Sequence, residues 1–201
     1  YAEFLSPGVV AMQPFIAGSI GGSMLWSDRR WGMFEQLMVG PFRRIDYLLG
    51  IIYVSMIFTV GGSLLMFLVS YVITGRFDVP LINLLVIMIT LILSSMLFTS
   101  IFLILSVAIQ TIQTYNTVTM FLFFILDFAS SAFYPINSKT PVELRAISMA
   151  NPLTYIVDSI RDLMFSKILS TDYIYIGIIV ILTFVLFGLA ILSYHHVRLG
   201  S

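Results

Sequence analysis

The chain has 201 residues, of which 59% are hydrophobic and only 10% are charged. Soluble domains carry about 25% charged residues, so this composition indicates a membrane protein. The ten basic and ten acidic side chains balance, which argues against a polyelectrolyte partner such as nucleic acid. The absence of cysteine excludes disulfides and thiolate metal sites.

Apolar stretches of about 20 residues, the length that crosses the hydrocarbon core, predict an all-α membrane protein. The expected architecture is a polytopic helical bundle in a single transmembrane domain, 1–201, with five spans at about 7–26, 47–74, 81–109, 115–133 and 173–194. Ser6-Pro7 predicts the start of the first span, because a hydroxyl cap followed by proline favours a helix N-terminus. Gly18 and Gly22, four residues apart, predict close packing of that span on a neighbouring helix.

A polar island, SDRRWGMFEQLMVGPFRRID, lies between the first two spans at residues 27–46. Its aromatic and aliphatic side chains recur at three- and four-residue spacing, with charged and amide side chains on the other side. This pattern predicts a short amphipathic helix over about 27–41, lying at the membrane surface and ended by Pro41.

Residues 134–171 carry three prolines and seven charged side chains and are too polar to span. Thr140, Pro141 and Glu143 predict one helix start with a capping box, and Asn151-Pro152 predicts a second. The second helix has an apolar face and a charged face, the latter formed by Asp158, Arg161 and Asp162. We expect two helices over about 140–166 that dip partway into the membrane or lie on it, with the charged face towards water or a cavity.

These motifs resemble a known family. The residues Asp28, Arg29, Gly32, Glu35, Gln36, Leu37, Pro41 and Arg43 are similar to the cytoplasmic loop of the type-two export family of ABC transporter permeases. The segments SSAFYPI at 130–136 and NPLTYIVDSIRDLMF at 151–165 resemble the outer half of the same family, which carries re-entrant helices.

The resemblance implies that residues 27–41 form a coupling helix that docks in a groove of a separate ATP-binding subunit. The residues expected to couple to that ATPase are Asp28, Arg29, Gly32, Phe34, Glu35, Gln36 and Leu37. Family permeases have six spans, so one further N-terminal span is expected in the full protein. In the family's topology, the loop at residues 27–46 and Ser201 would lie on the cytoplasmic side.

No motif for catalysis or nucleotide binding is present. Neither Lys139 nor Lys167 follows a glycine-rich run that would cradle phosphates, so ATP and Mg are expected to bind to the partner subunit and no cofactor to this chain. His195 and His196 are adjacent and point in different directions on a helix, so we expect neither a metal site nor an enzyme active site.

Asp127 is the one charged residue inside a predicted span. An ionised carboxylate there costs about 2.5–3.5 kcal/mol on insertion scales, so it is expected to face the protein interior or water. One interpretation places it in a substrate path beside Ser130 and Ser131. The other is a structural hydrogen bond to a neighbouring helix, and the sequence favours neither.

The resemblance therefore implies a multi-pass permease subunit of an ATP-driven exporter in a prokaryotic cell membrane. It would pair with a second copy as a homodimer and with two copies of an ATP-binding cassette subunit, in contact with membrane lipid. The expected substrate is amphiphilic: a drug-like molecule, a lipid or a lipid-linked glycan. The alternative is a proton-coupled or passive secondary transporter that uses Asp127, although no internal inverted repeat supports it.

Overall fold

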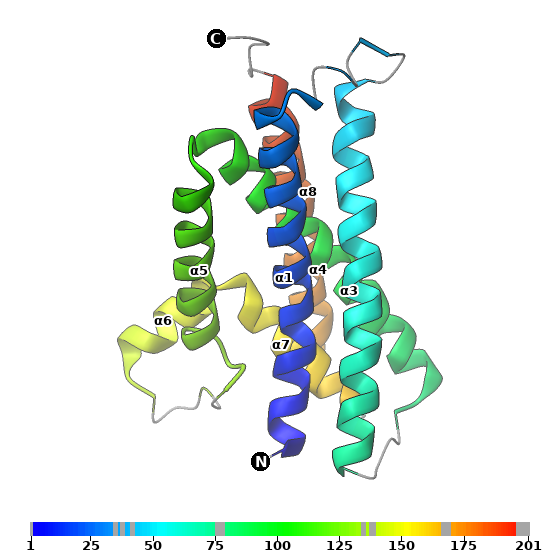
Figure 1. Cartoon of the computed structure of the whole chain (residues 1–201). Coiled ribbons are helices and arrows are strands. Elements are labelled where there is room, and N and C mark those ends of the chain that lie inside the picture. Colours follow the sequence, from blue (N-terminus) through cyan, green and yellow to red (C-terminus); the bar gives the residue numbers. More distant parts are fainter. Residues whose placement is uncertain are drawn as a thin grey trace.

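The computed structural model describes residues 2–33, 36, 39–40, 43–74, 79–133, 136, 140–165 and 170–195. Within these residues the regular structure is helical throughout, which confirms the predicted all-α fold (Figure 1). The helices are α1 (Ala2–Arg30), α3 (Arg44–Thr74), α4 (Leu81–Ala108), α5 (Ile112–Phe128), α6 (Val142–Ala150), α7 (Pro152–Met164) and α8 (Ser170–His195).

Four helices of the described chain are long and apolar enough to cross a membrane. These candidate spans are Phe4–Arg30, Arg44–Val72, Leu81–Ala108 and Asp172–Tyr194. The helix α5 has 17 residues, which lies at the lower end of the range of about 17–25 for a spanning helix. The helices predicted at 47–74, 81–109 and 173–194 are confirmed to within about three residues, because each is an uninterrupted apolar run.

The predicted start of the first helix at Ser6-Pro7 is wrong. α1 already begins at Ala2 and contains both Pro7 and Pro14. Burial explains this, because Val10 and Ala11 are 1% and 0% exposed and α1 lies against the segment that follows α5. A Cβ on Gly8 would lie 2.7 Å from the carbonyl oxygen of Ala132. This packing offsets the backbone hydrogen bonds that the prolines cannot make.

Two further predicted boundaries also differ. The fourth span was expected to reach residue 133, but α5 ends at Phe128 because side chains already satisfy its last carbonyls. Asn151 Nδ2 donates to Leu126 O at 2.6 Å and Ser130 Oγ donates to Asp127 O at 2.8 Å. The N-cap of α6 is Pro141 rather than the predicted Thr140, and Pro141 makes no side-chain cap hydrogen bond.

The cap predicted for the next helix is confirmed. Asn151 Oδ1 accepts a hydrogen bond from Leu153 N at 2.9 Å, and Pro152 occupies the first turn of α7. This cap and the Asn151 bond to Leu126 O together fix the start of α7 beside the end of α5.

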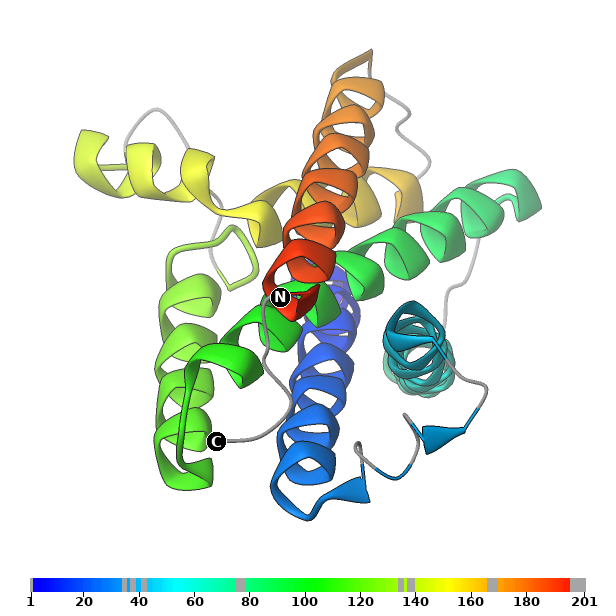
Figure 2. The same ribbon diagram turned by 90° about the horizontal axis from the view of Figure 1, so that it is seen from above.

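α1 lies at the centre of the bundle, with α3 and α5 on opposite sides of it, while α4 crosses it and α8 packs on α4 (Figures 1 and 2). Phe15 of α1 contacts three rings, with centroids 5.4 Å from Phe98, 5.0 Å from Phe102 and 5.5 Å from Phe123. α6 projects from the bundle beside α7 (Figure 2).

The predicted close packing at Gly18 and Gly22 is confirmed. A Cβ on Gly18 would lie 2.8 Å from Thr99 N, and one on Gly22 would lie 2.8 Å from Phe102 O. The backbones of α1 and α4 therefore approach each other along these two residues.

The bundle has two ends that matter for function (Figure 1). At the end called here the loop end, α1 finishes, α3 begins and α8 finishes. At the opposite end, called the α7 end, α1 begins and α5 finishes close to α6 and α7. The first residue of α1, Ala2, and the last residue of α8, His195, therefore lie at opposite ends of the bundle, as the five-span prediction requires.

Candidate functional site

The last turn of α1 is tied to two neighbouring helices at the loop end. The Tyr47 hydroxyl of α3 donates a hydrogen bond to the Asp28 carboxylate. Arg29 Nη1 donates to Ser106 O of α4 at 3.2 Å, and Trp26 Nε1 donates to Ile109 O at 3.1 Å. A displacement of this turn would therefore act directly on α3 and on the end of α4.

The predicted coupling helix does not begin at Ser27. Residues 27–30 are the end of α1, and the chain then turns at Gly32, whose φ is +70°. This left-handed conformation suits glycine and is typical of a helix C-terminus. Among the other residues expected to couple, Gln36 is exposed and its N–H donates to Gly32 O at 3.2 Å. Phe34, Glu35 and Leu37 lie outside the described residues.

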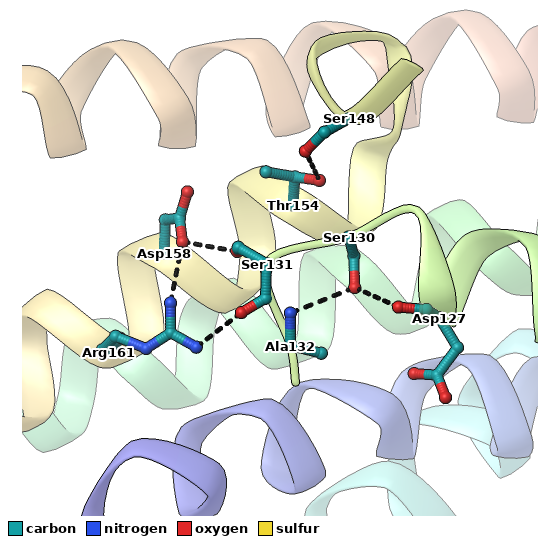
Figure 3. Close-up of polar contacts among 8 residues, drawn as sticks. All are labelled: Asp127, Ser130, Ser131, Ala132, Ser148, Thr154, Asp158 and Arg161. Carbon is teal, nitrogen blue, oxygen red and sulfur yellow. Dashed lines mark hydrogen bonds and ion pairs between the residues drawn. The ribbon is translucent and has the colours of Figure 1, made fainter. Parts of the chain in front are cut away.

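A charged network holds the α7 end together (Figure 3). Ser131 Oγ donates to Asp158 Oδ1 at 2.6 Å, and Arg161 Nη1 donates to the same oxygen at 3.1 Å. Arg161 Nη2 also donates to Ser131 O at 2.8 Å. The Arg161 guanidinium carbon lies 4.1 Å from the ring centroid of Phe4, a cation–π contact with α1.

The charged face of α7, which was expected to face water or a cavity, is partly covered and partly exposed. The side chains of Arg161 and Asp158 are 15% and 30% exposed. Burial raises the pKa of Asp158, while its hydrogen bond from Ser131 and the charge of Arg161 oppose that rise. The network joins α7, the segment 129–133 and the first turn of α1.

Asp162 lies on the same face, and its carboxyl has a pKa raised to about 6. Burial is the largest cause, and the neighbouring Asp172 and Asp158 add to the rise, while Arg161 opposes it. Between about pH 4 and 6, the Asp162 carboxyl therefore keeps its proton in the folded chain. In an unfolded chain, where the aspartate pKa is the ordinary 3.8, the same carboxyl loses most of its proton over this range.

Stability is consequently expected to fall as pH rises from about 4 to 6, and to stay lower above pH 6. Asp162→Asn should flatten this slope and raise the unfolding temperature at pH 7, because it removes a charge that burial and two carboxylates disfavour. Thermal unfolding in detergent across this pH range measures the effect. Glu143→Gln, at an exposed position of α6, is the control and should leave the slope unchanged. An unchanged slope in Asp162→Asn would contradict the assignment.

The residues predicted to line a substrate path, Asp127, Ser130 and Ser131, are close in sequence but do not form one cluster. All three are buried, at 4%, 0% and 2% exposed. Ser130 Oγ accepts from Ala132 N at 3.2 Å and donates to the Asp127 backbone, whereas Ser131 binds Asp158 (Figure 3). The Asp127 carboxylate points away from both serines, and its Oδ1 has no hydrogen-bond partner among the described residues.

A groove of about 380 Å³ runs between α1 and α5. Its walls combine hydroxyl and amide groups with apolar side chains and carry one carboxylate, near the loop end. The lining residues are Ser19, Ile20, Ser23, Met24, Ser27, Asp28, Tyr115, Asn116 and Thr119. Tyr115 OH donates to Ser19 O at 2.9 Å and so joins the two walls.

The chain thus combines a polar loop, long apolar helices and two short helices. The family model of the ABC-2 type transporter matches residues 2–165. The chain belongs to the ABC-2 type transporter family. An ABC-2 permease is a transport component that partners with an ATP-binding cassette subunit. A comparison with curated proteins finds no match.

For this ABC-2 permease, the loop and the α7 region could be recognised from the sequence, whereas the contacts that connect them to the bundle could not. The Asp28 bond to Tyr47 and the Arg161 contact with Phe4 join residues 19 and 157 positions apart, and no local pattern signals them. The Asp158–Arg161 pair is different, since its i,i+3 spacing on a helix is a recognisable signal for an ion pair. Among the described residues no group of three histidine or acidic side chains lies close enough to hold a metal ion.

Proposed function

We propose that this ABC-2 permease is the membrane subunit of an ATP-driven exporter in a prokaryotic cell membrane. It works as a homodimer, with two copies of an ATP-binding cassette subunit that bind ATP and Mg. The substrate is amphiphilic, either a drug-like molecule, a lipid or a lipid-linked glycan, and leaves the cytoplasm or the inner leaflet.

The family match over residues 2–165 carries this proposal, and the loop end supports it mechanically. The loop after Gly32 continues directly from α1, and the last turn of α1 is bonded to α3 and α4 through Asp28 and Arg29. An ATPase that moves the loop would therefore shift three helices together. In this proposal Asp28, Arg29 and Gly32 transmit the movement from the base of the loop, while Phe34, Glu35, Gln36 and Leu37 contact the ATPase.

The groove between α1 and α5 supports the choice of substrate class. Ser19, Ser23 and Thr119 offer hydroxyl groups beside apolar Ile20 and Met24, which suits a molecule with both polar and apolar parts. In the proposal this groove is one wall of the route, and buried Asp127 contributes to it at the other end of α5.

The proposal is tested by co-purifying the full-length protein with ATP-binding subunits encoded beside it. Glu35→Ala and Gly32→Pro are expected to reduce the retained ATPase at least tenfold, because the first removes a loop carboxylate and the second cannot adopt a positive φ. The matched control is Glu143→Ala, which removes an exposed carboxylate from α6, at the opposite end of the bundle.

Size-exclusion chromatography of each variant checks that it remains folded. Loss of the ATPase from folded loop variants, with retention in Glu143→Ala, would support the proposal. Retention of the ATPase by every variant would refute the assigned contacts, and failure of any ATPase to associate with wild type would refute the exporter.

A further inference from the structure

A second, smaller cavity lies at the loop end, between the first turns of α3 and the last turns of α8. It measures about 230 Å³ and is lined by Arg43, Arg44, Ile45, Leu48, Ile191 and Tyr194. We call it the boundary cavity. Pockets for drug-sized molecules measure roughly 300–1,000 Å³, so the boundary cavity can hold only part of a larger ligand.

The depth of the boundary cavity follows from the limits of the spans. Arg44 is the first residue of the candidate span Arg44–Val72, and Tyr194 is the last residue of Asp172–Tyr194. The mouth of the cavity therefore lies at the level of the lipid head groups. Leu48 and Ile191 each lie about one helical turn deeper. Charged groups at the boundary with apolar groups below them match the order of a phospholipid, from head group to acyl chain.

The lining of the boundary cavity contains two cations and no anion. Arg43 is exposed, and Arg44 is half-buried with Nη1 donating to Tyr194 O at 3.5 Å. Guanidinium groups bind phosphate oxygens through paired N–H donors. Two acids lie nearby, and neither lines the cavity: Asp46 Oδ2 accepts a hydrogen bond from Arg43 N at 3.0 Å, and the Asp28 carboxylate accepts one from the Tyr47 hydroxyl. The cavity is thus complementary in charge to a phosphate group.

We propose that the boundary cavity binds one anionic phospholipid. Its phosphate lies against Arg43 and Arg44, and its glycerol and upper acyl chain lie against Ile45, Leu48 and Ile191. The bound lipid holds the start of α3 against the end of α8. The cytoplasmic leaflet is rich in anionic lipids, and only this choice of leaflet rests on the orientation in the proposed exporter.

The test uses the purified full-length protein without ATPase, so its outcome is independent of the exporter proposal. Mixed micelles containing phosphatidylglycerol or phosphatidylcholine are titrated, and thermal unfolding and native mass spectrometry report binding. Wild type should be stabilised more by phosphatidylglycerol and retain one such lipid per chain. Arg43→Gln should weaken this binding about fivefold, the value of one arginine near an anionic surface.

Two further variants separate the boundary cavity from general charge effects. Arg30→Gln removes an exposed arginine at the same end that does not line the cavity, so it should leave binding unchanged. Ile45→Trp alters no charge but fills the cavity from a residue that is 42% exposed, so it should abolish binding without harming the fold.

Each of three outcomes would overturn the proposal. The first is equal stabilisation by both lipids, and the second is an equal loss in Arg30→Gln and Arg43→Gln, which would indicate unspecific attraction. The third is displacement of the lipid by millimolar inorganic phosphate in wild type, which would indicate a site for free phosphate instead.

Discussion

Alanine at Gly18 or Gly22 is expected to destabilise the folded chain by about 1–3 kcal/mol, the usual cost of overpacking a close-packed contact. The added Cβ at residue 18 would lie 2.8 Å from Thr99 N and 2.9 Å from Phe98 C, and at residue 22 it would lie 2.8 Å from Phe102 O. These are backbone atoms of α4, which cannot rotate aside as a side chain can. α1 and α4 must therefore separate, and the surrounding core loosens with them.

Gly61→Ala is the matched control, because no atom beyond the neighbouring backbone of α3 lies within 4 Å of the Cβ that it adds. Alanine favours helix over glycine by about 0.8–1.0 kcal/mol, so this variant should be neutral or slightly stabilised. Thermal unfolding in detergent and the yield of monodisperse protein measure both effects. If Gly18→Ala and Gly61→Ala unfold at the same temperature, the close approach of α1 to α4 is wrong.

Arg161→Gln is expected to destabilise the α7 end by about 2–4 kcal/mol, since it removes charge-assisted hydrogen bonds and a cation–π contact at once. Asp158 would retain its hydrogen bond from Ser131 but lose its countercharge while only 30% exposed. The segment 129–133 would lose the bond from Arg161 Nη2 to Ser131 O, and Phe4 would lose the guanidinium above its ring.

The size of this effect is checked by chemical or thermal unfolding against Arg145→Gln, which makes the same change at an exposed position of α6. Adding Asp158→Asn to Arg161→Gln should recover part of the loss, because it removes the unpaired charge. An Arg161→Gln variant as stable as Arg145→Gln would show that the network does not hold these three elements together.

Sequence reasoning located the long helices because their signal is local. The helices α3, α4 and α8 are continuous apolar runs, and the cap at Asn151 rests on a bond to Leu153, two residues away. The error at Pro7 has the opposite origin. A proline pattern typical of a helix start was outweighed by burial of Val10 and Ala11 against distant segments, which no local rule includes.

The candidate site was predictable in composition but not in geometry. The sequence marked Asp28 and Arg29 as polar residues of a surface helix, yet both bond inward from α1, to Tyr47 and to Ser106. Their partners lie on other helices, at 19 and 77 positions along the chain, so the contacts depend on how α3 and α4 pack. The left-handed turn at Gly32 likewise depends on where α1 ends, and helix periodicity does not specify that residue.

α5 packs on the bundle through few side chains, among them Tyr115 near its start, Phe123, whose ring contacts Phe15, and Asp127 near its end. Only Tyr115 and Asp127 of its side chains are buried, and between them Met120, Phe121 and Phe124 are at least half exposed. A helix with so little buried surface opens at a lower free-energy cost than α1 or α4. In hydrogen-exchange measurements α5 should therefore exchange its amides first, as a separate cooperative unit. The wall of the groove can thus change shape while the central helices stay folded.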